Sequence, residues 1–219
     1  MFQIVMEYCD GGPLSQYVAK NEMPAVLIQK WSQQLLDVLV YLHERRFIHR
    51  NINGANIILS SPDANSCNLK LTDLGDVKRI VSEVTQANEV PNEKGTHQFM
   101  SPEMVMNHRG NVGRCTDIWS LGCVVIQMVT GRAPRFFRGK TELLENQCIM
   151  FFIASGEPPA LPSGLPDLMQ RFIERCLISK VEDRPYAATL AMDPFLKSSD
   201  TTDWNMPNRK DHWKVYEQP

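Results

Sequence analysis

The chain has 219 residues, of which 43% are hydrophobic, enough to bury the core of one large domain. Its net charge of -2 gives no general reason to bind nucleic acid or an anionic membrane, so we expect proteins or small molecules as partners. The six cysteines lie far apart without a C-x-x-C pair, which excludes a zinc ribbon or a dense disulfide framework and favours reduced thiols in the cytosol.

The first predicted element is a β-strand over Phe2–Tyr8, because this segment is rich in β-branched and aromatic residues. It ends at the chain-breaking run Cys9–Pro13. The amino terminus has no basic n-region and already carries Glu7, so we expect no secretory signal and a cytoplasmic location. A long helix is predicted over Pro24–Arg46, where apolar residues recur at helical spacing and Pro24 is tolerated near the start.

A polar loop, His49–Asn56, follows this helix and leads into two short predicted strands, Ile57–Leu59 and Asn68–Leu71. The second strand runs into a tight Asp-x-Gly turn that begins at Asp73. The segment from there to Glu103 shows little regular periodicity, and loops of that length are usually functional or disordered.

The longest apolar run, Ile118–Val129, is too short to span a bilayer and predicts a core helix that others must surround. Two further helices are predicted over Thr141–Ser155 and Leu165–Leu177, before the motif Glu182–Pro185. From Lys197 onward the chain is polar, and we expect a tail that either packs on the domain or is disordered.

Taken together, these segments resemble the motifs of serine/threonine protein kinases, in the right order and at plausible spacings. The five segments are a hinge at Met6–Gly12, the catalytic loop at His49–Asn56, the metal-binding turn at Asp73–Gly75, the end of an activation segment at Gly95–Glu103 and a central helix at Asp117–Gly131. The wording of the central helix looks most like the mitogen-activated protein kinase kinase kinases. The resemblance implies an α+β fold, mainly α, which is the helical carboxy-terminal lobe of a kinase lacking most of the β-rich amino-terminal lobe.

The resemblance also implies boundaries and structural contacts. The boundaries are residues 1–12 for the last amino-terminal strand and hinge, 13–196 for the carboxy-terminal lobe with its catalytic loop at 49–56 and activation segment at 73–103, and 197–219 for the tail. Asp117 would accept hydrogen bonds from backbone N–H groups of the catalytic loop. Glu103 and Arg184 would form a buried ion pair.

Three residues depart from the kinase pattern. Asn51 stands where the catalytic aspartate is expected, and a neutral amide cannot accept a proton near pH 7. Asn53 replaces the lysine that places a positive charge near the transferring phosphoryl group. Leu74 replaces a phenylalanine, and we expect it still to fill an apolar slot.

By the same resemblance, Asn56 and Asp73 match two Mg²⁺ ligands, and both carry the oxygen donors that Mg²⁺ prefers. Such residues also cap loops and form turns. ATP would be bound by backbone groups of Glu7 and Cys9 and against Ile58, although Pro13 cannot supply the polar ribose contact that often occurs in the family.

Thr96 matches a catalytic-site threonine near the end of the activation segment, or it only hydrogen-bonds within that loop. Arg50 could pair with a phosphorylated hydroxyl of the activation segment, for which Ser82, Thr85 and Thr96 are available.

We therefore expect a kinase-family domain for ATP-dependent phosphoryl transfer in a signalling cascade, impaired because Asn51 replaces the catalytic aspartate. Its partners would be a kinase or a substrate of that cascade, and the sequence does not fix an oligomeric state. Two alternatives stay open: a pseudokinase that serves as an interaction or scaffold module, and a truncated gene product. A strand at Phe2–Tyr8 without its sheet predicts poor solubility or dependence on a partner.

Overall fold

A buried helix, α4 (Arg114–Thr130), forms the centre of the computed structural model. Every residue of α4 from Cys115 onward is buried, as predicted for a helix that is apolar on nearly every side. A Cβ atom on Gly122 would lie 2.7 Å from Cβ of Cys176, so this glycine permits close packing of the next helix. The structure describes residues 3, 5–80, 97–106, 112–134, 146–199, 206 and 209.

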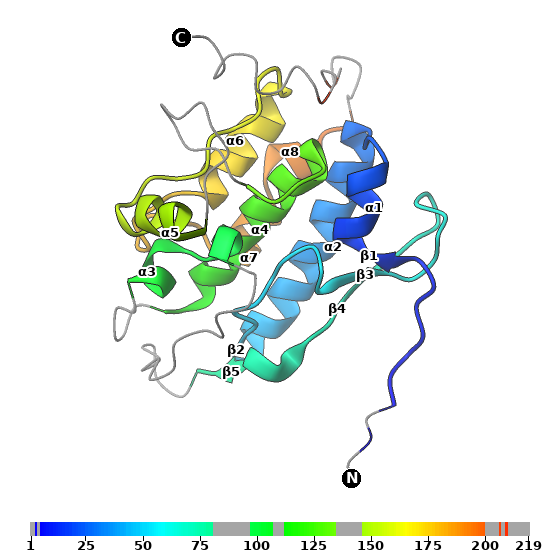
Figure 1. Ribbon diagram of the computed structural model, residues 1–219, viewed down its shortest axis with the longest axis horizontal. Coiled ribbons are helices and arrows are strands. Elements are labelled where there is room, and N and C mark those ends of the chain that lie inside the picture. Colours follow the sequence, from blue (N-terminus) through cyan, green and yellow to red (C-terminus); the bar gives the residue numbers. More distant parts are fainter. Residues whose placement is uncertain are drawn as a thin grey trace.

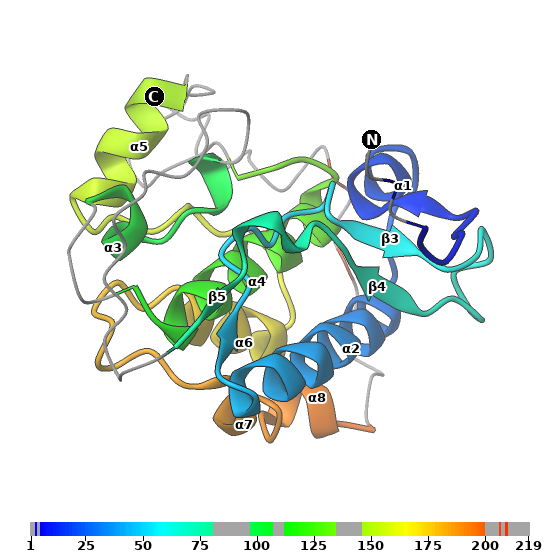
Figure 2. The ribbon, with the colours of Figure 1, turned by 90° about the horizontal axis from the view of Figure 1, so that it is seen from below.

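Other helices surround α4 (Figures 1 and 2). Those in contact with α4 are α1 (Leu14–Lys20), α2 (Ala25–Glu44), α6 (Asp167–Cys176) and α7 (Ala187–Leu190). A further helix, α8 (Pro194–Lys197), packs on α2 and α6. Large buried side chains from four of these helices fill the core, among them Trp31, Trp119, Phe172 and Phe195.

The long predicted helix is confirmed as α2. It begins after Pro24, which adopts φ -62° at the N-cap, and ends at Glu44. Its buried residues recur every three or four positions along one face, at Ile28, Trp31, Leu35 and Leu39. This face packs on the core, so α2 delivers the chain to the loop at residues 49–56 from a fixed position.

Two small antiparallel sheets hold the loops of the site. In the first, the strand order is β1 (Gly12–Pro13), β3 (Ile57–Leu59), β4 (Leu69–Leu71). In the second, β2 (Phe47–Ile48) pairs with β5 (Lys78–Arg79). The predicted strand pair is confirmed as β3 and β4, and beyond it the backbone N–H of Thr72 donates to the carbonyl of Asn56 at 2.8 Å. This contact places the end of the polar loop beside the start of the Asp-x-Gly turn.

The predicted strand over Phe2–Tyr8 is wrong for the residues of that segment that the structure describes, which are 3 and 5–8. They have no strand assignment, and Val5, Met6 and Tyr8 are exposed. The reason is physical: a β-strand needs a hydrogen-bonded neighbour, and no described strand pairs with this segment. The described residues are otherwise helix-rich with only small sheets, compatible with the predicted mainly α fold.

Other elements complete the helical part. They are the 3₁₀ turns η1 (Leu74–Asp76) and η2 (His97–Phe99), and the helices α3 (Pro102–Val105) and α5 (Asn146–Ala154). The predicted helix over 141–155 is thus found from Asn146 on, and residues 141–145 lie outside the described part. Among the described residues, no helix is both long and apolar enough to cross a membrane.

Two described residues of the tail contact the domain. Met206 packs against the hydrophobic core. The guanidinium of Arg209 donates to the carbonyls of Val18 and Asn21 at the carboxyl end of α1, at 2.7 and 2.6 Å. At these two positions the tail therefore packs on the domain, which was one of the two predicted alternatives.

Candidate functional site

The loop at residues 49–56 is held from below by Asp117 in α4. One carboxylate oxygen of Asp117 accepts from the backbone N–H of His49 at 2.9 Å, and the other from that of Arg50 at 2.8 Å. The first oxygen also contacts Nε2 of His43 at 2.9 Å. Because Asp117 is fully buried, these bonds fix the loop on the central helix, and the predicted structural role of Asp117 is confirmed.

The ring of His49 joins this loop to the Asp-x-Gly turn. Its Nδ1 accepts from the backbone N–H of Asn51 at 3.3 Å, so Nε2 carries the proton and donates to the carbonyl of Thr72 at 3.0 Å. His49 is fully buried. The contact sets the separation between Asn51 and Asp73, which follows Thr72 directly.

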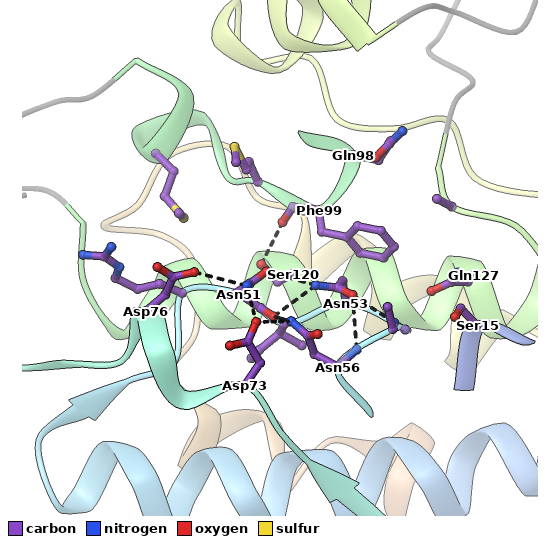
Figure 3. Close-up of a pocket in the computed structure, with 17 residues that line it drawn as sticks. Ser15, Asn51, Asn53, Asn56, Asp73, Asp76, Gln98, Phe99, Ser120 and Gln127 are labelled. Carbon is purple, nitrogen blue, oxygen red and sulfur yellow. Dashed lines mark hydrogen bonds between the residues drawn. The ribbon is translucent and has the colours of Figure 1, made fainter. Parts of the chain in front are cut away.

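Asn51 uses its side-chain amide as a hydrogen-bond donor between two carboxylates, as Figure 3 shows. Its Nδ2 lies 3.1 Å from Oδ2 of Asp73 and 3.2 Å from Oδ2 of Asp76. An amide NH₂ group offers hydrogens and no basic lone pair. At the position predicted for the catalytic aspartate, the structure therefore presents a donor rather than a base.

Asn53, within the same loop, is almost completely buried. Its Nδ2 donates to Oδ1 of Asn51 at 3.0 Å and to the carbonyl of Asn51 at 3.2 Å. Its own Oδ1 accepts from the backbone N–H of Ala55 at 2.9 Å. The side chain thus organises the loop, and it brings no positive charge to the site.

Asn56 and Asp73 are adjacent, as their predicted role as metal ligands requires. Nδ2 of Asn56 donates to the carbonyl of Asn51 at 2.9 Å and lies 3.4 Å from Oδ2 of Asp73. Oδ1 of Asn56 and Oδ1 of Asp73 accept no hydrogen bond from another described residue. These two hard oxygen atoms are therefore available to coordinate a metal ion. Mg²⁺ is typically bound by one or two carboxylates together with substrate phosphates and water, so these two residues fit it.

A cleft of about 430 Å³ opens above these side chains (Figure 3). Its wall also includes Ser15 of α1, whose backbone N–H donates to the carbonyl of Gly54 at 2.8 Å. Gln127 of α4 also lines the cleft, and its buried Oε1 accepts no hydrogen bond from a described residue. A Cβ on Gly54 would lie 2.2 Å from that oxygen, so the loop approaches α4 closely only because residue 54 is glycine.

The residues predicted to bind ATP lie outside this cleft. Oε2 of Glu7 forms an ion pair with Nζ of Lys70 at 3.1 Å, and Lys70 is the cross-strand partner of Ile58. Glu7 is thereby brought to the edge of the small sheet that carries Ile58, while Cys9 is half-buried nearby in sequence. None of Glu7, Cys9 and Ile58 lines the 430 Å³ cleft.

Part of the predicted activation segment is described. Thr96, Ser82 and Thr85 lie outside the described residues. Nε and Nη1 of Arg50 are buried, and no described residue accepts a hydrogen bond from them. The expectation for Leu74 is wrong: its side chain is 64% exposed, because no described residue packs over the turn at this point.

The predicted ion pair between Glu103 and Arg184 is confirmed. Nη1 and Nη2 of Arg184 donate to the two carboxylate oxygens of Glu103 at 2.8 and 3.1 Å, and both side chains are buried. Arg184 also donates to the carbonyls of Cys115, Ile178 and Ser179. The guanidinium therefore joins the end of the activation segment to the start of α4 and to the loop after α6.

Four of the six cysteines are buried, and all six are free thiols. Burial raises the pKa of Cys115, and the nearby guanidinium of Arg184 opposes that rise. Burial likewise raises the pKa of Cys123 and of Cys176 far above the ordinary range. These thiols remain protonated at neutral pH and take no part in the chemistry of the cleft.

The sequence reasoning missed three residues of the site. Asp76 follows the Asp-x-Gly turn directly, and a carboxylate at that position could have indicated a residue of the site. Gln127 could also have been recognised from the sequence, because it is a polar residue in the longest apolar run. Ser15 had no signal, since only the packing of α1 against the loop brings it to the cleft.

Comparison with known proteins gives consistent matches. Residues 1–196 match the family model for the protein kinase domain. The chain is 38% identical over 196 residues to mitogen-activated protein kinase kinase kinase 4 of Homo sapiens, covering 89% of this chain and 12% of that protein. It is 32% identical over 228 residues to MAP kinase kinase kinase SSK2 of Saccharomyces cerevisiae, covering 88% of this chain and 14% of that protein. It is also 34% identical over 195 residues to mitogen-activated protein kinase kinase kinase 1 of Arabidopsis thaliana, covering 89% and 30%. The chain thus spans less than a third of the length of each of these relatives.

Proposed function

The chain belongs to the protein kinase family, and we propose that it is a serine/threonine kinase domain of a mitogen-activated protein kinase cascade whose phosphoryl transfer is strongly impaired. The similarity to mitogen-activated protein kinase kinase kinases supports the cascade, with a kinase or a kinase substrate as the protein partner. The site geometry supports the impairment. A cytoplasmic location belongs to the same proposal.

One observation carries the impairment: the amide of Asn51 donates to Asp73 and Asp76. A substrate hydroxyl at this point needs an acceptor for its proton as the new O–P bond forms. Asn51 cannot serve, because its nitrogen is not basic and its oxygen already accepts from Asn53. Loss of a general base lowers the rate by a factor of about 10² to 10⁴.

Asn53 adds to this loss. Phosphoryl transfer depends chiefly on positioning and on stabilising negative charge in the transition state. The expected lysine would supply one such positive charge, and loss of a contact of this class raises the barrier by about 3–4 kcal/mol. The buried amide of Asn53 supplies only hydrogen bonds within the loop.

The binding of Mg²⁺ and ATP is a separate part of the proposal. Asn56 and Asp73 would hold the metal, which would neutralise phosphate charge when bound. Backbone groups of Glu7 and Cys9, beside Ile58, would hold the adenine. Asp117 and His49 keep the loop in place for this, through the hydrogen bonds that fix it on α4 and on the Asp-x-Gly turn.

Binding is tested by thermal shift with Mg-ATP on the chain and on its Asp73→Asn variant. We expect Mg-ATP to raise the melting temperature of the wild-type chain and to have a much smaller effect on the variant, since the variant loses a metal ligand. Mg-ADP and ATP with EDTA serve as controls. An equal shift in both chains would contradict the assignment of Asp73.

A second candidate function is that of a pseudokinase, a module that acts by binding proteins. The amino-terminal segment favours it, because Val5, Met6 and Tyr8 are 94%, 75% and 88% exposed and could form part of an apolar contact surface. The two functions differ in their dependence on Asp73. A cascade whose output survives Asp73→Asn in cells, but fails when Val5 and Tyr8 are replaced by serine, would favour the pseudokinase.

A further inference from the structure

A second groove lies away from the catalytic cleft, between the loop at residues 157–161 and α6. We call it the α6 groove. The loop that forms one wall of the groove lies between α5 and α6 in the chain (Figure 1). Its volume is about 430 Å³, within the range of sites that bind small ligands or a few side chains. It shares no lining residue with the cleft that contains Asn51.

The floor of the α6 groove is apolar and held in place. Ala160 and Leu177 line it and are almost fully buried, at 6% and 4% exposure. The loop above is fixed at its start, where Gly156, two residues after the end of α5, adopts φ 83° and its carbonyl accepts from the hydroxyl of Ser179. Buried lining residues and a loop fixed at its start indicate a groove that is formed before a ligand arrives, which lowers the entropy cost of binding.

The rim of the α6 groove is rich in hydrogen-bond acceptors and poor in donors. Glu157 and Glu174 place two exposed carboxylates on it. Pro158 and Pro159 also line the groove and have no backbone N–H to donate. The side chain of Gln170 is the exception, and its Nε2 already donates to Glu174 at 2.8 Å. A ligand that matches this rim must bring hydrogen-bond donors.

The negative charge of the rim is not neutralised by nearby cations. Among the described residues, no lysine or arginine lines the groove. Of the cations close in sequence, Arg175 pairs with Asp193 and Lys180 pairs with Asp183, while Arg171 of α6 forms no ion pair with either glutamate among the described residues. Within the described residues, neither Glu157 nor Glu174 forms an ion pair. The rim therefore attracts a positively charged group from outside.

We propose that the α6 groove binds a segment of a partner protein in which an arginine lies beside an apolar residue. The guanidinium offers five N–H donors in a planar fork that suits carboxylates, and the apolar neighbour covers Leu177 and Ala160. The described part of the chain's own tail does not supply this arginine, because Arg209 is bound at the end of α1. The binding is independent of phosphoryl transfer, since the cleft and the groove are separate.

The test is fluorescence anisotropy with a labelled peptide that alternates arginine and leucine between Gly-Ser ends. Two matched peptides carry citrulline for arginine or serine for leucine. The protein is tested as wild type, as the Glu157→Gln, Glu174→Gln double variant, and as Glu182→Gln, which removes an exposed carboxylate outside the groove. All substituted side chains are exposed, so the variants should have the same melting temperature as the wild type.

Each exposed charge pair changes Kd by a factor of about 1.5 to 5, so we expect loss of both pairs to make the double variant bind the arginine–leucine peptide roughly 2- to 25-fold more weakly. Glu182→Gln should bind as the wild type does. The citrulline peptide should show the same loss on the wild type and no further loss on the double variant. High salt should weaken only the arginine peptides.

Three results would overturn the proposal. Equal affinity of wild type and double variant would place the peptide elsewhere. Equal affinity for the leucine and serine peptides would show a diffuse charged surface rather than a groove. A wild-type dimer in sedimentation that the double variant abolishes, and that the peptide does not displace, would make a second copy of the chain the occupant.

Discussion

Replacing Asn51 by aspartate tests the donor role of its amide. The new carboxylate would stand about where Nδ2 now lies, 3.1 Å from Oδ2 of Asp73 and 3.2 Å from Oδ2 of Asp76. Two hydrogen bonds would be exchanged for two like-charge contacts. Even at the dielectric constant of water each contact costs about 1.3 kcal/mol, and Asp76 is only half exposed.

We therefore expect Asn51→Asp to lower the free energy of unfolding by roughly 2 to 3 kcal/mol in EDTA at low salt, which is a fall in Tm of about 4–12 °C for a chain of this size. Mg²⁺ should reverse most of the loss, because its two positive charges offset two of the three negative charges of the carboxylates. The wild-type chain should respond much less to Mg²⁺ alone. The measurement is urea and thermal unfolding with EDTA or MgCl₂.

The matched control is the exchanged pair Asn51→Asp, Asp76→Asn, which keeps one carboxylate and one amide at these two positions. Its stability in EDTA should return most of the way to the wild-type value. An Asn51→Asp variant as stable as the wild type in EDTA would refute the reasoning. So would a destabilised variant that neither Mg²⁺ nor high salt restores.

Three further predictions concern the scaffold. Arg184→Met leaves the carboxylate of Glu103 buried without its partner and should cost about 3–5 kcal/mol in urea unfolding, and a second change, Glu103→Leu, should recover part of that loss. Asp117→Asn turns an amide donor toward one of two backbone N–H groups of the catalytic loop, so it should cost about 1–3 kcal/mol and speed hydrogen exchange there. Iodoacetamide at pH 8 should modify the exposed Cys148 in the native protein and leave Cys123 unmodified until urea unfolds the chain, because burial raises the pKa of Cys123 and blocks access of the reagent. Mass spectrometry of the peptides measures the modification at each cysteine, and modification of Cys123 before unfolding would contradict its burial.

The parts of the fold that the sequence predicts well are those set by a strong local pattern. The helix α4 is apolar on nearly every side and therefore has to be central, and α2 has a regular apolar stripe. The contacts of Asp117 and the pair of Glu103 with Arg184 were predicted from the family resemblance. Periodicity could not have shown them, because their partners lie 67 to 81 residues apart.

The failures have a common cause. A strand over Phe2–Tyr8 was predicted from composition, but strand formation needs a neighbour that composition does not supply. Leu74 was expected in an apolar slot, and its exposure depends on what else covers the turn. The bridge from Asn51 to Asp76 joins residues 25 positions apart and follows from the tertiary placement of the turn.

The central claim is that Asn51 and Asn53 silence a site that is otherwise formed. The most direct test is phosphate transfer from Mg-ATP to a mixture of serine- and threonine-containing peptides by the wild-type chain and by the Asn51→Asp, Asn53→Lys double mutant, with thermal shift to confirm nucleotide binding in both. We predict that Mg-ATP stabilises both chains and that only the double mutant transfers phosphate, by a margin of at least about 10². Transfer by the wild-type chain at a similar rate, or none by a double mutant that binds Mg-ATP, would contradict the claim.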